Sequence, residues 1–271
     1  MKLFPGITFQ VCPDNAAATD AAAALIGAAV RQKPDLVLGL ATGRTPIDVY
    51  RRLIGMHRSE GLTFAGVRSF NLDEYFDIAP DNPASYDYYM RRQLFDHIDM
   101  PADNWHIPVG YVNLDEIGAR CDDYEAAITA VGGIDLQLLG IGRNGHIGFN
   151  EPTSSLASRT RIKTLTEKTL RDNSRFYKDP SQQPQVASTL GIGTILDAKR
   201  ILLQAYGEKK AEAIKASVEG PISSFWPGSA LQMHADVTFI LDEESAAQLE
   251  MIEYFRKSRA EGIRLQDKNT I

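Results

Sequence analysis

Cysteine is scarce in this sequence. Its 271 residues include only Cys12 and Cys121, and no CxxC pair occurs. The chain therefore has no disulfide framework on which a fold could depend. The five histidines show neither an HExxH motif nor a paired spacing. Zinc sites are usually built from such pairs, so we expect no metal.

Long apolar runs are also missing. No stretch approaches the roughly 18 consecutive apolar residues of a membrane-spanning helix, and the most apolar segment, residues 16–30, is interrupted by Thr19 and Asp20. The opening residues lack the apolar run of a signal peptide, because Pro5 and Gly6 break it. We therefore expect a soluble, cytoplasmic protein that does not bind a membrane.

An excess of positive charge is absent too. The chain has 29 Lys and Arg residues against 35 Asp and Glu residues, a net charge of −6. A nucleic-acid surface needs clustered Lys and Arg, so we expect no nucleic-acid partner. A small anionic substrate remains compatible with this balance, since a local pocket can be basic on an acidic protein.

Short apolar runs alternate with amphipathic stretches along the whole chain. This alternation predicts one α/β domain over residues 1–271, with an open, mostly parallel, Rossmann-like sheet and helices on both faces. No Gly-, Ser- or Pro-rich linker and no internal repeat divides it. The expected helices are 16–32, 46–57, 86–98, 114–131, 167–177, 208–220 and one from about 243; the expected strands are 36–40, 67–72, 105–108, 134–139, 160–166, 200–207 and 236–242. Ligands bind such sheets at the carboxyl ends of the strands.

The first expected strand is followed by the loop Ala41–Thr45 and by Pro46. We expect Thr45 to cap a helix and Pro46 to open it, where its missing N–H costs nothing. The amides of such a helix start can bind an anion. The alternative is an ordinary turn before a capped helix, and the spacing of a Walker A loop is absent.

Residues 140–145 match the GxGxxG pattern of dinucleotide-binding loops and follow an expected strand. That pattern needs its third glycine inside a helix that continues for several turns. Here Gly148 and Pro152 interrupt the helix that would follow, so we reject a dinucleotide site. The segment is instead rich in polar side chains at the expected ligand edge, namely Asn144, His146, Asn150 and Glu151.

Two acidic residues, Asp73 and Glu74, lie at the end of another expected strand. A partly buried carboxylate there can act as a general base. Side chains alternate along an extended backbone, so only one of the pair is expected to face the ligand. The residues themselves do not say which one, and Asp73 could instead cap a turn.

Taken together, these segments resemble the glucosamine-6-phosphate deaminase family. The matching stretches run in order from residue 36 to about 240 and are LGLATGRTP, SFNLDEY, LLGIGRNGHIGFNEP, SSLASRTRIKTLT, DNSRFY, GEKKAEAIKASVEG and the WPGSALQMH region. The resemblance implies conversion of glucosamine 6-phosphate to fructose 6-phosphate and ammonia without a cofactor, in the catabolism of N-acetylglucosamine.

The resemblance also implies roles for individual residues. Asp73 matches the base that moves a proton from C2 to C1 of the open-chain sugar, and His146 matches the ring-opening base. Glu151 would orient His146, while Asn144 occupies a position that is Asp or Asn in the family. The residues that match the phosphate site are Thr42, Gly43, Arg44, Thr45, Arg175 and Lys210, although Arg44 stands where several relatives have Gly.

A second site is implied by the same resemblance. Ser154, Arg161, Lys163 and Thr164 match the segment that binds N-acetylglucosamine 6-phosphate between the subunits of allosteric hexamers, and Tyr254 has a comparable C-terminal setting. This implies a homo-hexamer with an activator. Alternatively, Arg161 and Lys163 lie on a solvated strand.

Three other functions compete with this one. A galactosamine-6-phosphate deaminase differs only in the epimer it accepts. The 6-phosphogluconolactonases share the fold but lack the FNEP and SRTRIKTLT segments. A non-catalytic sugar-phosphate sensor would need a DNA-binding helix-turn-helix, and no spare length exists for one. Asp73, His146 and Glu151 also favour catalysis over sensing.

Overall fold

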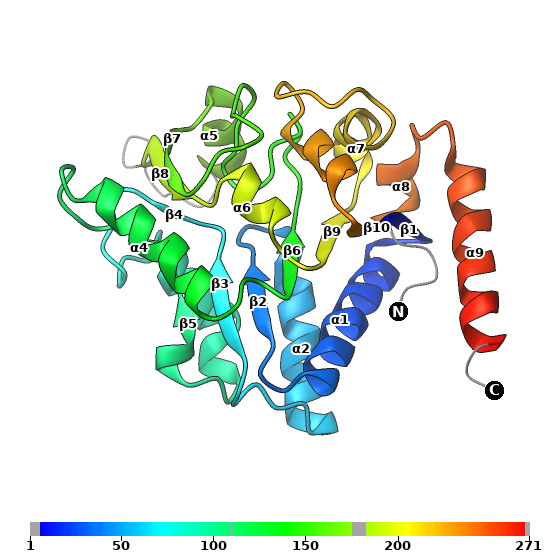
Figure 1. Ribbon diagram of the computed structural model, residues 1–271, viewed down its shortest axis with the longest axis horizontal. Coiled ribbons are helices and arrows are strands. Elements are labelled where there is room, and N and C mark those ends of the chain that lie inside the picture. Colours follow the sequence, from blue (N-terminus) through cyan, green and yellow to red (C-terminus); the bar gives the residue numbers. More distant parts are fainter. Residues whose placement is uncertain (1–5, 109, 175–182, 269–271) are drawn as a thin grey trace.

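A computed structural model describes residues 6–108, 110–174 and 183–268. Seven strands form the main sheet, and every neighbouring pair in it is parallel (Figure 1). Their order across the sheet is β1 (Gly6–Cys12), β10 (Asp236–Asp242), β9 (Ile201–Ala205), β6 (Leu136–Leu139), β2 (Val37–Leu40), β3 (Arg68–Asn71) and β5 (Trp105–His106). This confirms the expected parallel α/β sheet, and it adds β1, which the sequence did not predict.

Helices cover both faces of the sheet. They are α1 (Asn15–Gln32), α2 (Thr45–Glu60), α3 (Tyr86–Gln93), α4 (Ile117–Ala130), α5 (Glu167–Asn173), α6 (Ile192–Leu196), α7 (Ala211–Val218), α8 (Glu243–Ala246) and α9 (Ile252–Lys268). Helices α1, α2 and α3 share one buried cluster with the sheet, whereas α4, α6 and α7 share another. The expected helices exist, but α3 ends earlier than predicted and the C-terminal one is divided into α8 and α9.

The two hydrophobic cores follow from the alternation of side chains along the strands. In β2, Val37 faces the α4 side while Leu38 faces the α1 side, and in β10 Phe239 and Ile240 divide in the same way. Strands that are buried on both faces are continuously apolar, which is the pattern of a parallel sheet between helical layers.

A second, smaller sheet lies beyond the carboxyl ends of the main strands. It has three antiparallel strands in the order β4 (Asp73–Tyr75), β8 (Val186–Thr189) and β7 (Arg161–Thr164). The sequence predicted a strand near 160–166 but placed it in the parallel sheet, and β4 and β8 were not predicted. Periodicity marks a strand without saying which sheet it joins.

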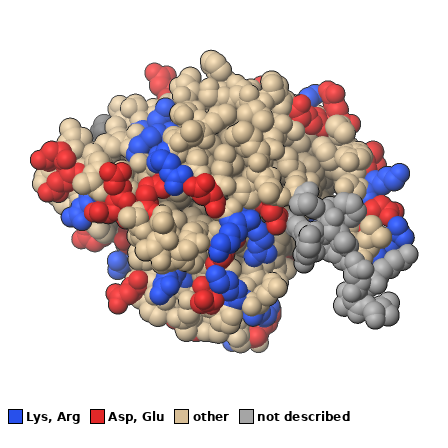
Figure 2. All heavy atoms as spheres, in the orientation of Figure 1, with Lys and Arg blue, Asp and Glu red and all other residues tan. Residues whose placement is uncertain are grey.

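Helix α9 packs beside the edge strand β1, where the rings of Phe9 and Phe255 stack with centroids 4.0 Å apart. Arg259 donates a hydrogen bond to Gln10 across the same contact at 2.6 Å. None of the helices in the described ranges is long and apolar enough to cross a membrane. On the face shown in Figure 2, Lys and Arg side chains lie among Asp and Glu side chains.

Candidate active site

A cleft of about 630 Å³ opens at the carboxyl edge of the main sheet. Its walls come from the loops that follow β2, β3, β6 and β9. Chain order reverses between the neighbours β2 and β6, because the chain proceeds to β3 and β5 on one side before returning to β6 on the other. Such a switch point leaves a crevice between diverging loops, and it is the usual ligand site of these sheets.

Most of the predicted active-site residues line this cleft. Those along its wall are Thr42, Gly43, Arg44, Thr45, Asp73, His146 and Lys210. Glu151 is buried behind the wall, and Asn144 contacts it there. Arg175 lies outside the described residues. The sequence reasoning missed other lining side chains, among them Tyr86, Thr169, Asn173 and Tyr206.

The structure distinguishes between the two adjacent carboxylates. Asp73 lines the cleft, and one of its oxygens accepts a hydrogen bond from Thr42 Oγ1 at 3.3 Å. Glu74 points the opposite way and accepts backbone N–H bonds from Tyr75, Tyr86 and Asp87 at 2.8–3.0 Å. Because side chains alternate along β4, Asp73 faces the cleft while Glu74 faces the first residues of α3. The sequence had predicted that Asp73 ends the strand that is β3, but Asp73 is the first residue of β4.

Asp73 has the burial that a general base requires. It is 5% exposed, and burial raises its pKa from 3.8 to about 7, with neighbouring Glu74 adding to the rise and the Thr42 hydroxyl opposing it. A carboxylate with a pKa near neutrality is both substantially ionised and basic enough to accept a proton from carbon.

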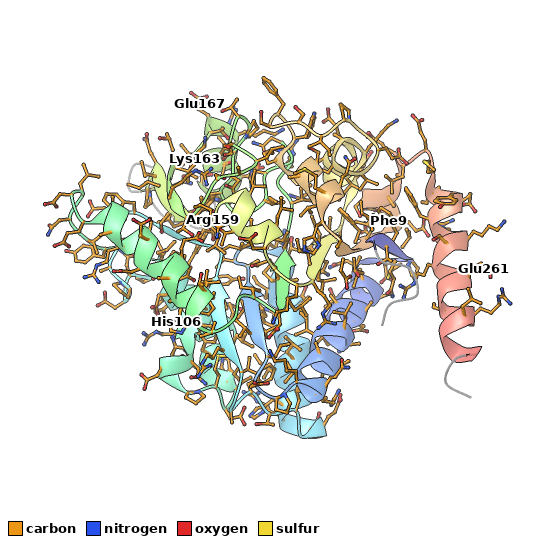
Figure 3. The ribbon with its side chains drawn as sticks, in the orientation of Figure 1. Phe9, His106, Arg159, Lys163, Glu167 and Glu261 are labelled. Carbon is orange, nitrogen blue, oxygen red and sulfur yellow. The ribbon has the colours of Figure 1, made fainter. Side chains whose placement is uncertain are left out.

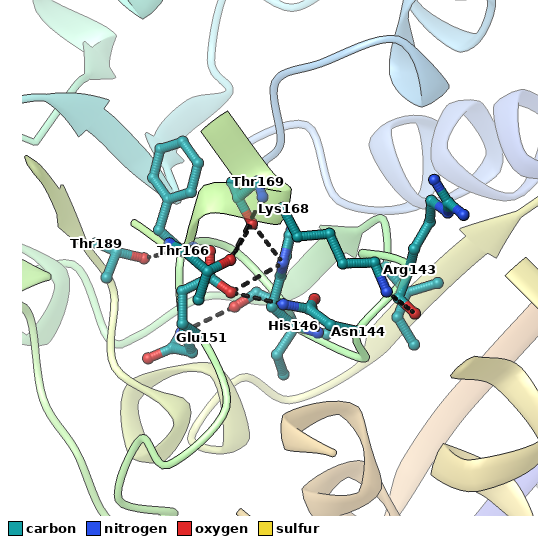
Figure 4. A network of polar contacts seen from close by, with 12 residues as sticks. Arg143, Asn144, His146, Glu151, Thr166, Lys168, Thr169 and Thr189 are labelled. Atoms are coloured by element: carbon teal, nitrogen blue, oxygen red, sulfur yellow. Dashed lines mark hydrogen bonds and ion pairs between the residues drawn. The ribbon is translucent and has the colours of Figure 1, made fainter. Parts of the chain in front are cut away.

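A second group of polar side chains surrounds Glu151 (Figure 4). Nδ1 of His146 lies 3.5 Å from Glu151 Oε2, and Asn144 donates its amide N–H to the same oxygen at 2.8 Å. Asn144 also accepts the backbone N–H of His146 at 3.3 Å. One amide thus connects both members of the pair, which fixes the imidazole relative to the carboxylate.

Glu151 is held as an anion despite its burial. Burial by itself would raise the pKa of Glu151, but hydrogen bonds from His146, Thr169 and Asn144, together with attraction to His146, lower it to about 2. Toward Glu151, Asn144 acts as a donor. An ionised Asp in its place could not donate to Glu151, and the two carboxylates would repel each other.

Gly142 allows the imidazole to lie against the backbone. A Cβ built on Gly142 would lie 2.3–2.5 Å from three atoms of the His146 ring. In this chain, Gly142 of the dinucleotide-like pattern therefore makes room for the His146 ring. As predicted, the described residues between this pattern and β7 contain no helix.

The loop before α2 forms the opposite wall of the cleft. Helix α2 begins at Thr45, and Arg44 occupies the capping position without a side-chain cap bond. The prediction that Thr45 caps the helix was wrong by one residue, because the helix starts earlier than Pro46. Since no side chain in the described part of the chain caps it, the amino end of α2 is available to an anion in the cleft. Gly43 has a φ of 96°, a left-handed conformation that favours glycine.

Lys210 reaches the cleft from the loop after β9. Its ammonium donates to the backbone carbonyl of Ile141 at 2.6 Å, which holds the charge between the β6 and β9 loops. Lys210 and the start of α2 both border the cleft, so a cation and a helix amino end are presented to the same space.

The predicted second site is only partly assembled within one chain. Ser154 is 2% exposed, and neither its Oγ nor Nη2 of Arg161 has a partner in the part of the chain that is described. Nη1 of Arg161 donates to Asn150 Oδ1 at 2.9 Å, and burial lowers the pKa of Arg161. The alternative interpretation required Arg161 to lie on a solvated strand face, and the burial of its guanidinium contradicts this.

The other residues of the second site are more open or more distant. Lys163 is partly buried on β7, and Thr164 is exposed at the end of that strand. Tyr254 is 60% exposed on α9. Strand β7, with Lys163, and helix α9 lie at opposite ends of the molecule (Figure 3). Tyr254 could therefore join this group only from a second chain.

No group of three His, Cys, Asp or Glu side chains lies close enough to bind a metal ion within residues 6–108, 110–174 and 183–268.

Comparison with known proteins agrees with this geometry. A family model described as glucosamine-6-phosphate isomerases/6-phosphogluconolactonase matches residues 14–240, most of the sequence. The chain belongs to this family. Its members include a glucosamine-6-phosphate deaminase of Hahella chejuensis, 55% identical over 88% of this chain and 90% of the relative. Another, from Shewanella loihica, is 51% identical over 94% of this chain and 95% of the relative.

A solved structure supports the same assignment. The structure of a monomeric glucosamine-6-phosphate deaminase is similar to this chain, with a TM-score of 0.86 and 45% sequence identity. The match covers 89% of this chain and 99% of the deaminase.

Proposed function

We propose that the protein converts glucosamine 6-phosphate and water to fructose 6-phosphate and ammonium, by isomerisation followed by loss of the amine. One observation carries the proposal: the buried carboxylate of Asp73 lines the same cleft as the His146–Glu151 pair. The reaction needs two acid–base groups at different positions, because the sugar ring must open before C2 can lose its proton.

The reaction follows from the positions of these groups. His146 moves the proton between O1 and the ring oxygen O5, which opens the ring, and Glu151 stabilises the imidazolium formed on the way. Asp73 removes the C2 proton, which the neighbouring ammonium acidifies, and returns a proton to C1. The resulting ketimine at C2 adds water and releases ammonium. No redox step occurs, so the chemistry is balanced without an oxidant or a reductant.

Phosphate binding orients the sugar for these transfers. In this proposal Thr42, Gly43, Arg44 and Thr45 offer the loop and the amides of α2, while Lys210 offers a fixed charge, and Arg175 completes the set. Binding energy from a group remote from C2 assists the reaction only where it positions the transition state.

Substrate choice tests the proposal. Purified protein should release ammonia from glucosamine 6-phosphate faster than from galactosamine 6-phosphate, and it should not accelerate hydrolysis of 6-phosphogluconolactone. Faster turnover of the galactosamine epimer would change the assigned substrate. Lactone hydrolysis without ammonia release would replace the assigned reaction.

Lys210→Ala should separate recognition from chemistry. Loss of the cation at the cleft should lower kcat/KM for glucosamine 6-phosphate by about a hundredfold, the scale of a hydrogen bond to a charged group at about 3 kcal/mol. The already poor use of unphosphorylated glucosamine should change far less. Steady-state kinetics on both substrates measure the difference, and equal losses on the two would show that Lys210 acts in folding or chemistry.

The proposal extends to regulation. Ser154, Arg161, Lys163 and Thr164 would bind N-acetylglucosamine 6-phosphate, with Tyr254 supplied by a second chain. The Ser154 Oγ and Arg161 Nη2, which lack partners among the described residues, support a polar ligand at this position. The hexamer stays a prediction, and the monomeric deaminase with this fold means that the fold does not require one. A cytoplasmic location and a role in N-acetylglucosamine catabolism belong to the same proposal, since charged sugar phosphates do not cross membranes unaided.

Lys163→Ala should remove activation and leave the saturated rate nearly unchanged, because Lys163 does not line the cleft. In the parent protein the activator should lower the substrate concentration for half-maximal rate, since it must prefer one of two conformations. Initial rates across a range of activator concentrations measure this. Hyperbolic kinetics that ignore the activator would contradict regulation while leaving the catalytic assignment intact.

A further inference from the structure

Helix α5 begins against the His146–Glu151 pair, and the contact is made by two threonines (Figure 4). Thr166 caps the helix, and its backbone N–H donates to Glu151 Oε1 at 3.3 Å. Thr169, one turn further on, places its Oγ1 3.4 Å from Nδ1 of His146. The side chain of Thr169 also lines the cleft, although the residue is only 3% exposed.

The hydrogen bonds between the threonines have a defined direction. The backbone N–H of Thr169 donates to Thr166 Oγ1 at 3.3 Å, as in an ordinary helix cap, and the Thr166 hydroxyl donates to Thr169 Oγ1 at 3.2 Å. The hydroxyl proton of Thr169 then remains free to be donated to Glu151, and this hydrogen bond is one of those that lower the pKa of Glu151. In this direction each hydroxyl polarises the next, which strengthens the last bond of the chain.

The same arrangement determines which imidazole nitrogen is available for catalysis. Nδ1 faces two oxygens, those of Glu151 and Thr169, and an ionised Glu151 requires a proton on the nitrogen that faces it. Nε2 is then the nitrogen left to accept a proton from the sugar. The ring cannot turn freely, because it lies against Gly142.

We propose that Thr169 is a positioning residue for His146: its hydroxyl, aligned by Thr166, holds Glu151 and keeps Nδ1 protonated, so that Nε2 serves as the ring-opening base. The proposal rests on the deaminase function given above. In this proposal the Thr169 hydroxyl is directed at His146 and Glu151 and not at the reacting atoms. It acts through His146 and Glu151, so the rate of ring opening depends on the position of α5 relative to this pair.

Replacing Thr169 with another uncharged residue removes none of the charged groups near the pair. On α5, Lys168 Nζ donates to the backbone carbonyl of Arg143 at 3.5 Å. Asp172 Oδ1 lies 3.7 Å from Nη1 of the same arginine. Asp73 lines the same cleft as His146, and a Cβ on Gly148 would lie 3.5 Å from its Oδ2. A change of pH profile in such a variant would therefore come from the lost hydroxyl and not from a lost charge.

Thr169→Val tests the proposal because it removes the hydroxyl and keeps the shape, while Thr169→Ser keeps the hydroxyl. We expect Thr169→Val to lower kcat for glucosamine 6-phosphate by about tenfold, with KM nearly unchanged, the scale of one hydrogen bond to a charged group. The acidic limb of its kcat/KM–pH profile should move to higher pH. Without the Thr169 donor, Glu151 is a stronger acceptor and the pair holds an added proton more tightly.

The serine variant should return both the rate and the pH profile to near the parent values. An unchanged rate and profile in Thr169→Val would overturn the proposal. A slower variant with an unmoved acidic limb, or a limb that moves without rescue by serine, would also overturn it by showing a structural role alone. If Thr169→Val does not fold, Thr169→Ala carries the same expectations. Failure of the parent to release ammonia would overturn the proposed function instead.

Discussion

Asp73→Asn should lower kcat for glucosamine 6-phosphate by about a thousandfold or more, within the usual range for a general base. The amide fits the same space and can still accept the hydrogen bond from Thr42, but it cannot accept a proton from C2. Substrate should still bind, because the proposed phosphate site is formed by other residues. Steady-state kinetics and calorimetric binding measure the two effects, and exchange of the C2 proton with D2O should stop in the variant.

The same substitution should stabilise the folded protein at alkaline pH. The pKa of Asp73 is raised from 3.8 to about 7 on folding, so between these pH values the unfolded chain releases a proton that the folded chain keeps. The free energy of unfolding therefore falls as pH rises from about 4 to 7 and stays lower above 7. The amide of the variant does not ionise, and the gain at pH 8 is at most about 4 kcal/mol.

Denaturant unfolding of both proteins at pH 5 and pH 8 measures this gain. The advantage of the variant should be larger at pH 8. Near-normal C2 exchange in Asp73→Asn would remove the base assignment, and a variant less stable than the parent at pH 8 would contradict the burial of an ionisable Asp73.

Gly142→Ala should reduce kcat by about a hundredfold or more, comparable to the loss of a general acid–base group. The new methyl group would lie within 2.5 Å of three His146 ring atoms, so the ring must leave its position beside Glu151. Phosphate binding should survive, and KM should change much less than kcat. Kinetics across the pH range would measure the loss.

Gly140→Ala is the matched control for this effect. It lies in the same loop, but its added Cβ would meet its nearest neighbour, Thr45, at 3.9 Å, an ordinary contact. The control should therefore keep most of the parent's kcat. Equal losses in the two variants would mean that the loop tolerates no alanine, and the specific contact between Gly142 and His146 would not account for the result.

Much of the fold could be predicted because its signals are local. The buried strands β2, β6, β9 and β10 are apolar runs between amphipathic stretches, and these two patterns suffice to predict a parallel sheet between helical layers. The polar residues at the strand ends were also predictable, since the sheet brings its carboxyl ends to one edge.

Other features depend on contacts between distant parts of the chain. Pairing of β4 with β8 joins residues more than 100 positions apart, as in the bond of Ser188 Oγ to the carbonyl of Glu74, and no short pattern records it. The choice between Asp73 and Glu74 likewise depends on α3, whose first amides bind Glu74.

Thr169 shows a further limit of the sequence. Its spacing from Thr166 is that of a helix cap, and that role is real, because the backbone N–H of Thr169 bonds to Thr166 Oγ1. The contact of its own hydroxyl with His146 crosses from α5 to the loop after β6. A capping pattern describes only bonds within one turn, so a catalytic neighbour in another loop leaves no trace in it.

The most direct test of the catalytic assignment is the product formed by the parent protein from glucosamine 6-phosphate in D2O, followed by NMR together with ammonia release. Removal of the C2 proton by Asp73 and return of a proton to C1 predict ammonia and fructose 6-phosphate in equal amounts, with deuterium at C1 of the ketose. Fructose 6-phosphate entirely without deuterium at C1 would indicate a direct hydride shift and contradict the role of Asp73. Absence of ammonia would contradict the proposed reaction itself.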